Sequence, residues 1–344
     1  MAESIGWPIL IKAVGGGGGR GMKLVHQPEK FAETIELAVA EAQAAFGDPR
    51  VYLERYVSAG RHVEVQVLGD GENLIHLGDR DCSLQRRYQK LVEEAPAPHL
   101  NPDLRGNMHR AAVALGEHLR YRGLGTVEFL VDCARDTFYF LEMNARIQVE
   151  HPVTEAICGL DLVAEQIAIA EGRPLRFKQD DIVFSGHAIE CRLNAEDLAY
   201  DFRPSPGAVT RAAFPCGEGI RVDTHMQAGA KVSPYYDSLV AKLIVHGADR
   251  AAALARMRAA LAHCDIQGIA TNLAVHEEVM REEDFVAGGV TTALVPLVHR
   301  TARAAGRRPW LRSKSSTPRS ATAIRVSGAR PGSRPGKSLK SRRW

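Results

Sequence analysis

Two glutamates in neighbouring apolar segments are placed where they could bind a divalent cation. Glu128 and Glu142 lie on either side of a short polar turn, a pattern that predicts a β-hairpin. If the turn centres near Arg135, Glu128 faces Glu142 at about 5 Å, and Asn144 shares the face of Glu142. Facing carboxylates repel each other, and an all-oxygen ligand set suits magnesium or manganese. The alternatives are one protonated glutamate or a surface hairpin paired with arginine.

A glycine-rich segment, Gly15–Gly21, follows Lys12 and separates two predicted strands, 7–14 and 22–26. Backbone amides without a neighbouring Cβ can close around phosphate oxygens. The dinucleotide fingerprint requires a helix directly after such a turn, but here the next predicted helix begins only at Pro28. The P-loop pattern fails as well, because no Gly-Lys-Ser/Thr follows at the required spacing. We therefore expect a phosphate-binding loop between two strands, with a ligand-free hairpin as the alternative.

A charged run follows the predicted hairpin. In an extended segment over 144–151, the period of two places Arg146, Gln148 and Glu150 on one side. A guanidinium, an amide and a carboxylate that converge could hold a small oxyanion, with Glu150 as the general base. Residues 85–90 form a second basic cluster. For both runs a solvated loop is the alternative, and His62 alone is more typical of a hydrogen-bonded strand histidine than of a metal ligand.

The elements that must position these residues are read from hydrophobic periodicity. Over 62–68 polar and apolar residues alternate, which predicts a strand with one polar face. The other predicted elements are strands 7–14, 22–26, 51–57, 125–132, 138–144 and 186–193, and helices 28–46, 102–121, 161–171 and 248–263. From residue 299 onward Arg, Ser, Gly and Pro dominate, so we expect a disordered tail.

Composition excludes several classes of protein. The 344 residues, 45% hydrophobic and 25% charged, are typical of a globular chain of about two domains. No run approaches the about 18 apolar residues of a membrane span, no basic start of a secretory signal is present, and the six cysteines form no CxxC pair. We therefore expect a cytoplasmic protein that has no membrane partner.

The net charge of +3 is the sum of two parts of the chain with opposite charge. Residues 300–344 contain 14 Lys and Arg and no acidic residue, which leaves 30 basic and 41 acidic residues in the rest. An acidic body offers no basic surface for nucleic acid, so we expect no nucleic-acid partner.

Taken together, these segments resemble the biotin carboxylases. The resemblance covers about residues 1–297, and its strongest stretch is 141–155, which reads LEMNARIQVEHPVTE. The other matching stretches, in chain order, are IKAVGGGGGRG (11–21), RHVEVQ (61–66), RDCSLQRRYQK (80–90), EEAPAP (93–98), ECRLNAED (190–197) and PSPG (204–207).

The resemblance implies an α+β architecture with an ATP-grasp fold over 1–175, whose lid is 1–57. The biotin carboxylase C-terminal domain follows over 183–297, and 298–344 is a disordered basic tail. The Rossmann-like domain that normally precedes the lid is expected to be absent, Tyr88 stands where many relatives have histidine, and a frame error would produce the tail.

The resemblance also implies a reaction, in which ATP phosphorylates bicarbonate to carboxyphosphate, which then carboxylates biotin. The implied ATP contacts are Lys12, Gly16, Gly17, Gly18 and Gly19 for the phosphates, and Glu54, Arg55, Val57, His62, Gln85, Leu130 and Leu141 around the adenine. Two magnesium ions (or manganese) would be carried by Glu128, Glu142 and Asn144.

Bicarbonate would bind at a second set of residues, with Glu150 as the base that deprotonates it: Lys90, Arg146, Gln148, Val149 and Glu150. Arg192 matches the arginine that stabilises the biotin enolate, so it is the implied biotin contact. The implied catalytic residues are therefore Glu150, Arg192, Lys90 and Arg146.

The chain has no Ala-Met-Lys-Met motif, so its biotin must be free or attached to another protein. The implied partners are a biotin carboxyl carrier protein and the carboxyltransferase of an acetyl-CoA or acyl-CoA carboxylase, in fatty acid biosynthesis. A homodimer is left open. The alternatives are the corresponding part of pyruvate carboxylase or another biotin-dependent carboxylase, and a catalytically inactive fragment. A ligase similar to carbamoyl-phosphate synthetase is disfavoured by the segment around Arg192.

Overall fold

The structure is a computed structural model that describes residues 2–16, 21–292 and 294. Its contacts divide the chain into two units, Met1–Trp310 and Leu311–Trp344, and all described residues belong to the first. The predicted disordered tail lies outside the described residues, and so do Gly17, Gly18 and Gly19. Within the described part, no helix is both long and apolar enough to span a bilayer.

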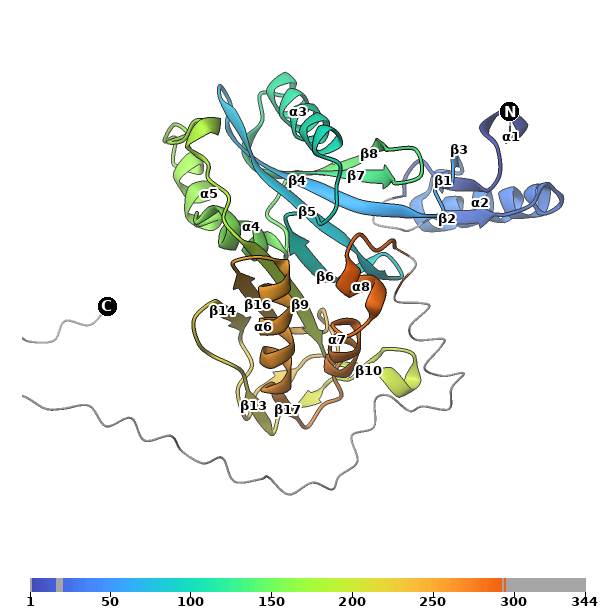
Figure 1. Cartoon of the computed structure of the whole chain (residues 1–344). Coiled ribbons are helices and arrows are strands. Elements are labelled where there is room, and N and C mark those ends of the chain that lie inside the picture. The colour runs from blue at the N-terminus through green and yellow to red at the C-terminus, as the bar shows by residue number, and fades with distance from the viewer. Residues whose placement is uncertain (1, 17–20, 293, 295–344) are drawn as a thin grey trace, which may run out of the picture. The chain divides into compact units, whose positions relative to one another are not determined.

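One eight-stranded sheet dominates the first unit (Figure 1). Every neighbouring pair in it is antiparallel. The strands, in spatial order, are β14 (Ile220–Thr224), β16 (Leu239–Gly247), β9 (His187–Asn194), β6 (Gln89–Ala95), β5 (Leu74–Arg86), β4 (Gly60–Asp70), β7 (Arg122–Asp132) and β8 (Thr137–Asn144). Because β6 pairs with β9, residues from both predicted domains, 1–175 and 183–297, join in one sheet.

Helices cover both faces of this sheet (Figure 1). On one face, α3 (Pro102–His118) packs on β4 and β5 over the valines of β4, and α6 (Arg250–Ala262) packs on β9 and β16. On the other face lie α4 (His151–Cys158) and α5 (Leu162–Ala170). Ile244 of β16 faces α4, whereas its neighbours Leu243 and Val245 face α6, as strand alternation requires.

A three-stranded sheet of order β2-β1-β3 forms the predicted lid segment. It consists of β1 (Ile9–Ala13), β2 (Met22–Val25) and β3 (Val51–Arg55). The predicted helix over 28–46 begins with a 3-10 turn, Pro28–Lys30, and continues as α2 (Phe31–Phe46), which packs on this sheet. Gly47 ends it with a φ of 72°, a left-handed conformation that costs glycine little.

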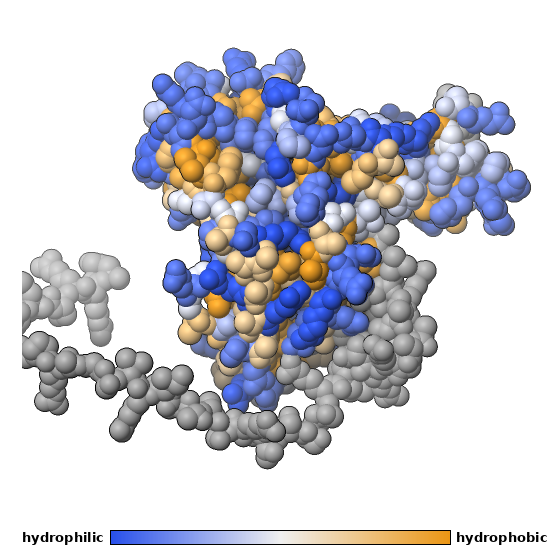
Figure 2. Space-filling model, viewed as in Figure 1, coloured by the Kyte–Doolittle hydropathy of each residue, from blue (hydrophilic) through white to orange (hydrophobic). Residues whose placement is uncertain are grey.

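Short elements complete the described part. They are α1 (Ala2–Ile5), the 3-10 turns Gln179–Asp181 and Leu198–Tyr200, β10 (Glu196–Asp197), β11 (Arg203–Pro204), β12 (Gly207–Ala208), β13 (Arg211–Ala213), β15 (Lys231–Val232), β17 (Asp265–Gln267), α7 (Leu273–Val279) and α8 (Glu283–Ala287). Polar residues cover much of the viewed surface, but hydrophobic residues are visible over α5 (Figure 2). That helix exposes Val163 and Ile167.

Some predictions about elements need correction. Residues 85–90, for which a solvated loop is the alternative above, form the ends of β5 and β6 and the turn between these two central strands. The predicted hairpin register is confirmed at Glu128 and Glu142. Nearer the turn it is wrong by one residue, because β8 contains an irregularity and Phe129 pairs with Phe140. The predicted helix over 102–121 ends at His118.

Candidate active site

The two predicted metal-binding glutamates face each other. Glu128 of β7 and Glu142 of β8 are direct register partners. The Nδ2 of Asn144 donates to Glu128 Oε1 at 3.1 Å and to Glu142 Oε1 at 3.2 Å, so all three residues meet. A donor that bridges two carboxylates occupies the place a cation would take. Rotation of this amide would present an oxygen instead, which gives Mg²⁺ three oxygen ligands, so the residues fit that ion.

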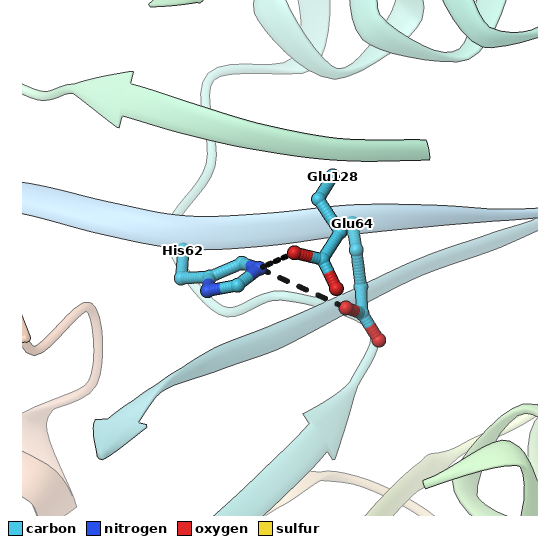
Figure 3. Close-up of side chains that lie close together, drawn as sticks. All are labelled: His62, Glu64 and Glu128. Carbon is cyan, nitrogen blue, oxygen red and sulfur yellow. Dashed lines mark ion pairs between the residues drawn. The ribbon is translucent and has the colours of Figure 1, made fainter. Parts of the chain in front are cut away.

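Glu128 is held in its ionised form. Burial opposes its charge, but His62 and Lys90 beside it keep the pKa of Glu128 well below its usual value. His62 Nε2 lies 3.1 Å from Glu128 Oε2 and 3.8 Å from Glu64 Oε2 (Figure 3). The other ring nitrogen, Nδ1, lies 2.7 Å from Gln85 Nε2, so these two predicted adenine contacts do adjoin.

Lys90 joins three carboxylates. Its Nζ lies 2.6 Å from Glu64, 3.0 Å from Glu128 and 2.6 Å from Glu150, and its side chain is 12% exposed. Burial alone would lower the pKa of Lys90, but the surrounding carboxylates raise it well above the ordinary value. Burial likewise disfavours the Glu64 carboxylate, yet Lys90 and Arg80 lower the pKa of Glu64 to about 2. Lys90 and the three carboxylates around it are therefore paired charges at neutral pH.

Arg192 of β9 binds the predicted general base. Its Nη2 donates to Glu150 Oε2 at 2.8 Å, and its Nε donates to Glu93 Oε1 at 2.6 Å. Burial raises the pKa of Glu150 and the charge of Glu64 adds to this, but Lys90 and Arg192 outweigh both and lower it. An ionised carboxylate can accept a proton, as a general base must.

The predicted extended run over 144–151 is wrong in conformation. His151 N donates to Gln148 O and Val153 N donates to Glu150 O, so the chain turns directly into α4. Gln148 is buried and donates to Glu128 Oε1 at 2.9 Å, whereas Arg146 is exposed and donates to Asn144 Oδ1 at 2.9 Å. These residues still gather near Glu150, but the turn brings them together rather than strand alternation.

A cavity of about 750 Å³ opens over these groups. Its walls come from β4, β6, β7, β8 and the turn before α4, and from β9 and β16. Ten predicted site residues line it: His62, Lys90, Glu128, Glu142, Asn144, Arg146, Gln148, Val149, Glu150 and Arg192. The predicted metal, bicarbonate and biotin contacts thus share one cavity.

Among the residues that the structure describes, the remaining predicted ATP contacts do not line this cavity. We call the three-stranded sheet of β1, β2 and β3 the small sheet. In it, Lys12 Nζ lies 3.2 Å from Glu54, and Arg55 Nε donates to Ile5 O at 2.9 Å. A Cβ placed on Gly60 would meet Leu130 Cδ1 at 2.5 Å and Val57 Cγ1 at 3.5 Å, so these two apolar side chains converge there.

Two other predicted ATP contacts are placed as follows. Leu141 is exposed at the irregularity of β8, and Gly16 N donates to Ala13 O at 3.0 Å at the start of the glycine loop. Their ATP roles stay predictions.

Sequence reasoning missed the residue at the centre of the site. Arg80 of β5 is fully buried and donates to Glu64, Gln66, Thr126, Gln148 and Thr154. The polar face predicted for 62–68 could have indicated such a residue, because polar side chains on a buried strand need polar partners. We call Glu64, Arg80, Lys90, Glu128, Glu150 and Arg192 the central cluster.

Two protein families match the chain. Residues 1–178 match the family described as carbamoyl-phosphate synthase L chain, ATP binding domain, and residues 190–296 match the biotin carboxylase C-terminal domain. The Nostoc sp. biotin carboxylase is 52% identical over 296 residues, 86% of this chain and 66% of that protein. A pyruvate carboxylase subunit from Methanothermobacter thermautotrophicus is 50% identical, over 86% of this chain and 60% of that protein.

Solved structures agree with these matches. The biotin carboxylase domain of Hydrogenobacter thermophilus 2-oxoglutarate carboxylase, a dimer with MgADP, ADP and bicarbonate, has a TM-score of 0.82 and 46% identity, over 86% of this chain and 65% of that one. The Campylobacter jejuni biotin carboxylase has a TM-score of 0.82 and 43% identity, over 86% and 66%.

The chain spans 56% to 66% of the length of the curated relatives compared. The two family matches, the identities and the arrangement of the site agree: this chain belongs to the biotin carboxylase family.

Proposed function

We propose that this chain carboxylates biotin, using ATP and bicarbonate, on a carrier protein supplied in trans. The observation that carries the proposal is the chain of contacts from Lys90 through Glu150 to Arg192, on one side of a cavity that Glu128 and Glu142 also line. The proposal is supported by relatives that are biotin carboxylases and by a related domain bound to MgADP and bicarbonate.

The proposed roles follow from the charges of the residues. Lys90, Arg146 and the amide of Gln148 hold the bicarbonate anion, and the carboxylate of Glu150 takes its proton. The bicarbonate oxygen then attacks the γ-phosphorus of ATP, which releases ADP and forms carboxyphosphate. Arg192 provides a fixed cation beside the negative charge that develops on biotin. Lys90 and Arg192, the two charged partners of Glu150, keep its carboxylate ionised until it accepts the proton of bicarbonate.

Glu128, Glu142 and Asn144 would hold Mg²⁺ or Mn²⁺. When bound, such an ion neutralises charge on the transferring phosphoryl group. In the same proposal, Lys12 and the glycine loop hold the ATP phosphates, and Glu54 releases Lys12 to them.

In the wider proposal, this chain is a component of an acetyl-CoA or acyl-CoA carboxylase that acts in the cytoplasm and serves fatty acid biosynthesis. Its partners would be a biotin carboxyl carrier protein and a carboxyltransferase, and the dimeric Hydrogenobacter domain supports a homodimer. The Methanothermobacter relative favours a second candidate, a component of pyruvate carboxylase. The carboxyltransferase that accepts carboxybiotin from this chain distinguishes the two.

ATP turnover tests the proposal. We expect ADP release to require bicarbonate and to rise when free biotin is added. Arg192→Lys should retain ATP binding but lose the rise with biotin, because a lysine cannot reproduce both guanidinium contacts. Arg173→Lys, on an exposed arginine, is the matched control. ATP binding without any turnover would support the inactive fragment instead.

A further inference from the structure

Two glutamates that the proposed reaction does not use lie buried beside Arg192. Glu93 of β6 and Glu190 of β9 are direct register partners, so their side chains share one face of the sheet. Both are 0% exposed. Glu93 Oε1 accepts from Arg192 Nε at 2.6 Å. Among the described residues, no hydrogen-bond partner exists for Glu93 Oε2 or for either oxygen of Glu190.

The charged groups around this pair are already engaged. Arg192 divides its guanidinium between Glu93 and Glu150. The other charged groups on the elements around the pair have the following partners: Lys90 with Glu64, Glu128 and Glu150; Arg80 of β5 with Glu64; Lys242 of β16 with Val149 O at 3.0 Å and Asp223 at 3.2 Å; His151 of α4 with Gln148 O; and Glu155 of α4 with Arg221. Cys82 of β5 also interacts with Glu93, but burial raises the pKa of this thiol well above its ordinary value, so it supplies no charge. Glu190 therefore has no cation in contact with it in the described structure.

An ionised carboxylate without a partner is costly in a protein interior, by several kcal/mol. The charges of Glu93 and Glu190, on paired strands, would also repel each other. A single proton removes both costs, because a protonated Glu190 becomes a donor and Glu93 Oε2 is the nearby acceptor that lacks one.

We propose that Glu93 and Glu190 share one proton and that this singly charged pair positions Arg192 for the reaction with biotin. The positioning role rests on the proposed function, whereas the shared proton does not. Burial is the largest cause that raises the pKa of Glu190, and the neighbouring Glu93 adds to it. Burial likewise raises the pKa of Glu93, against the opposing charge of Arg192.

The shared proton can be tested without any activity measurement. Glu190→Gln keeps the size and a donor but cannot ionise. In infrared difference spectra at neutral pH, the carbonyl band of a protonated carboxylic acid should be missing from this variant. Glu36→Gln, on an exposed residue of α2, should retain the band. A spectrum of Glu190→Gln that keeps the full band overturns the proposal.

Unfolding gives a second measurement. A group whose pKa is raised by folding stabilises the protein below its ordinary pKa, and that contribution is lost as the pH rises through the folded value. The Tm of Glu190→Gln relative to that of the parent should therefore increase as the pH rises from the ordinary glutamate pKa through the raised folded value. A constant Tm difference across this range contradicts a shared proton.

The positioning role is tested by comparing turnover with and without biotin. Glu93→Gln removes the charge that holds Arg192 Nε, so the biotin-dependent rise in turnover should fall at least about tenfold more than turnover without biotin. Glu93→Asp should restore part of the biotin-dependent rise, because aspartate keeps the negative charge. Glu190→Gln should keep the biotin response at alkaline pH, where the parent loses it.

Equal losses with and without biotin would reduce Glu93 to a structural residue and overturn the positioning role. A parent chain with no biotin response overturns this role together with the proposed function, while the infrared band and the Tm series still decide the shared proton.

Discussion

Lysine–glutamate pairs occur both in the small sheet and in the central cluster, but the two regions hold them under different conditions. Lys12 meets Glu54 at 3.2 Å, with side chains 22% and 42% exposed. Lys90 meets three carboxylates, and the Glu64 side chain among them is fully buried. Water screens the first pair, so the free energy it contributes is small, whereas the second group depends on its partners for all compensation of charge. Lys12 can therefore leave Glu54 at little cost in stability, whereas loss of the Lys90 charge would leave buried carboxylates uncompensated.

Removal of the Lys90 charge should have the largest effect. Lys90→Met leaves three carboxylates without their common partner, so we expect a loss of about 3 to 5 kcal/mol in the free energy of unfolding. ATP turnover should disappear as well. Denaturant titration gives the first quantity, and Lys30→Met, whose pair with Glu33 is exposed, serves as the control. A loss as small as that of the control would remove the distinction between the two regions.

Glu142→Gln should separate chemistry from stability. Glu142 is exposed, and a glutamine can still accept the hydrogen bond from Asn144, so Tm should stay close to that of the parent. Turnover that depends on Mg²⁺ should fall by about a hundredfold or more, because a charged ion ligand is lost. Normal turnover at saturating Mg²⁺ would contradict the metal assignment.

Acid should destabilise the protein through the central cluster. Folding lowers the pKa of Glu64 from 4.5 to about 2, so the stability it contributes is complete above the ordinary value and is lost as the pH falls toward 2. The free energy of unfolding of the parent should decline over this interval. Glu64→Gln should flatten that decline, whereas Glu36→Gln should follow the parent.

The smallest expected change in stability comes from the small sheet. Lys12→Met should alter the free energy of unfolding by at most about 1 kcal/mol, because its pair with Glu54 is partly exposed. The KM for ATP should nevertheless rise about tenfold, from the loss of one charge–phosphate contact. Lys23→Met breaks a comparable pair between β2 of the same sheet and Glu41 of α2, and it should leave this KM unchanged. Equal values of KM for both variants would contradict a phosphate role for Lys12.

The sequence predicted the parts of this molecule that depend on local pattern. The strand alternation over 62–68 and the facing pair Glu128 and Glu142 are both confirmed. The role of Arg80 could not be found in this way, because its five partners lie between 14 and 74 residues away along the chain. Likewise, 85–90 could resemble a solvated loop because its charges meet their partners only in the folded chain. Arg86 and Arg87 pair with Asp201, and Lys90 pairs with three carboxylates from other segments.

The irregularity in β8 restricts how the length of this strand can change in descendants of the gene. Near the turn, Phe138 pairs with Val131 and faces the core beneath α3, but beyond Phe140 one extra residue shifts the register so that Glu142 meets Glu128. Regular pairing of the same sequence, without the irregularity, would place Leu141 opposite Glu128 and Glu142 opposite Val127, a core position. The strand can therefore lose one residue, Leu141, and keep Glu142 opposite Glu128, but a second loss has no irregularity left to absorb it.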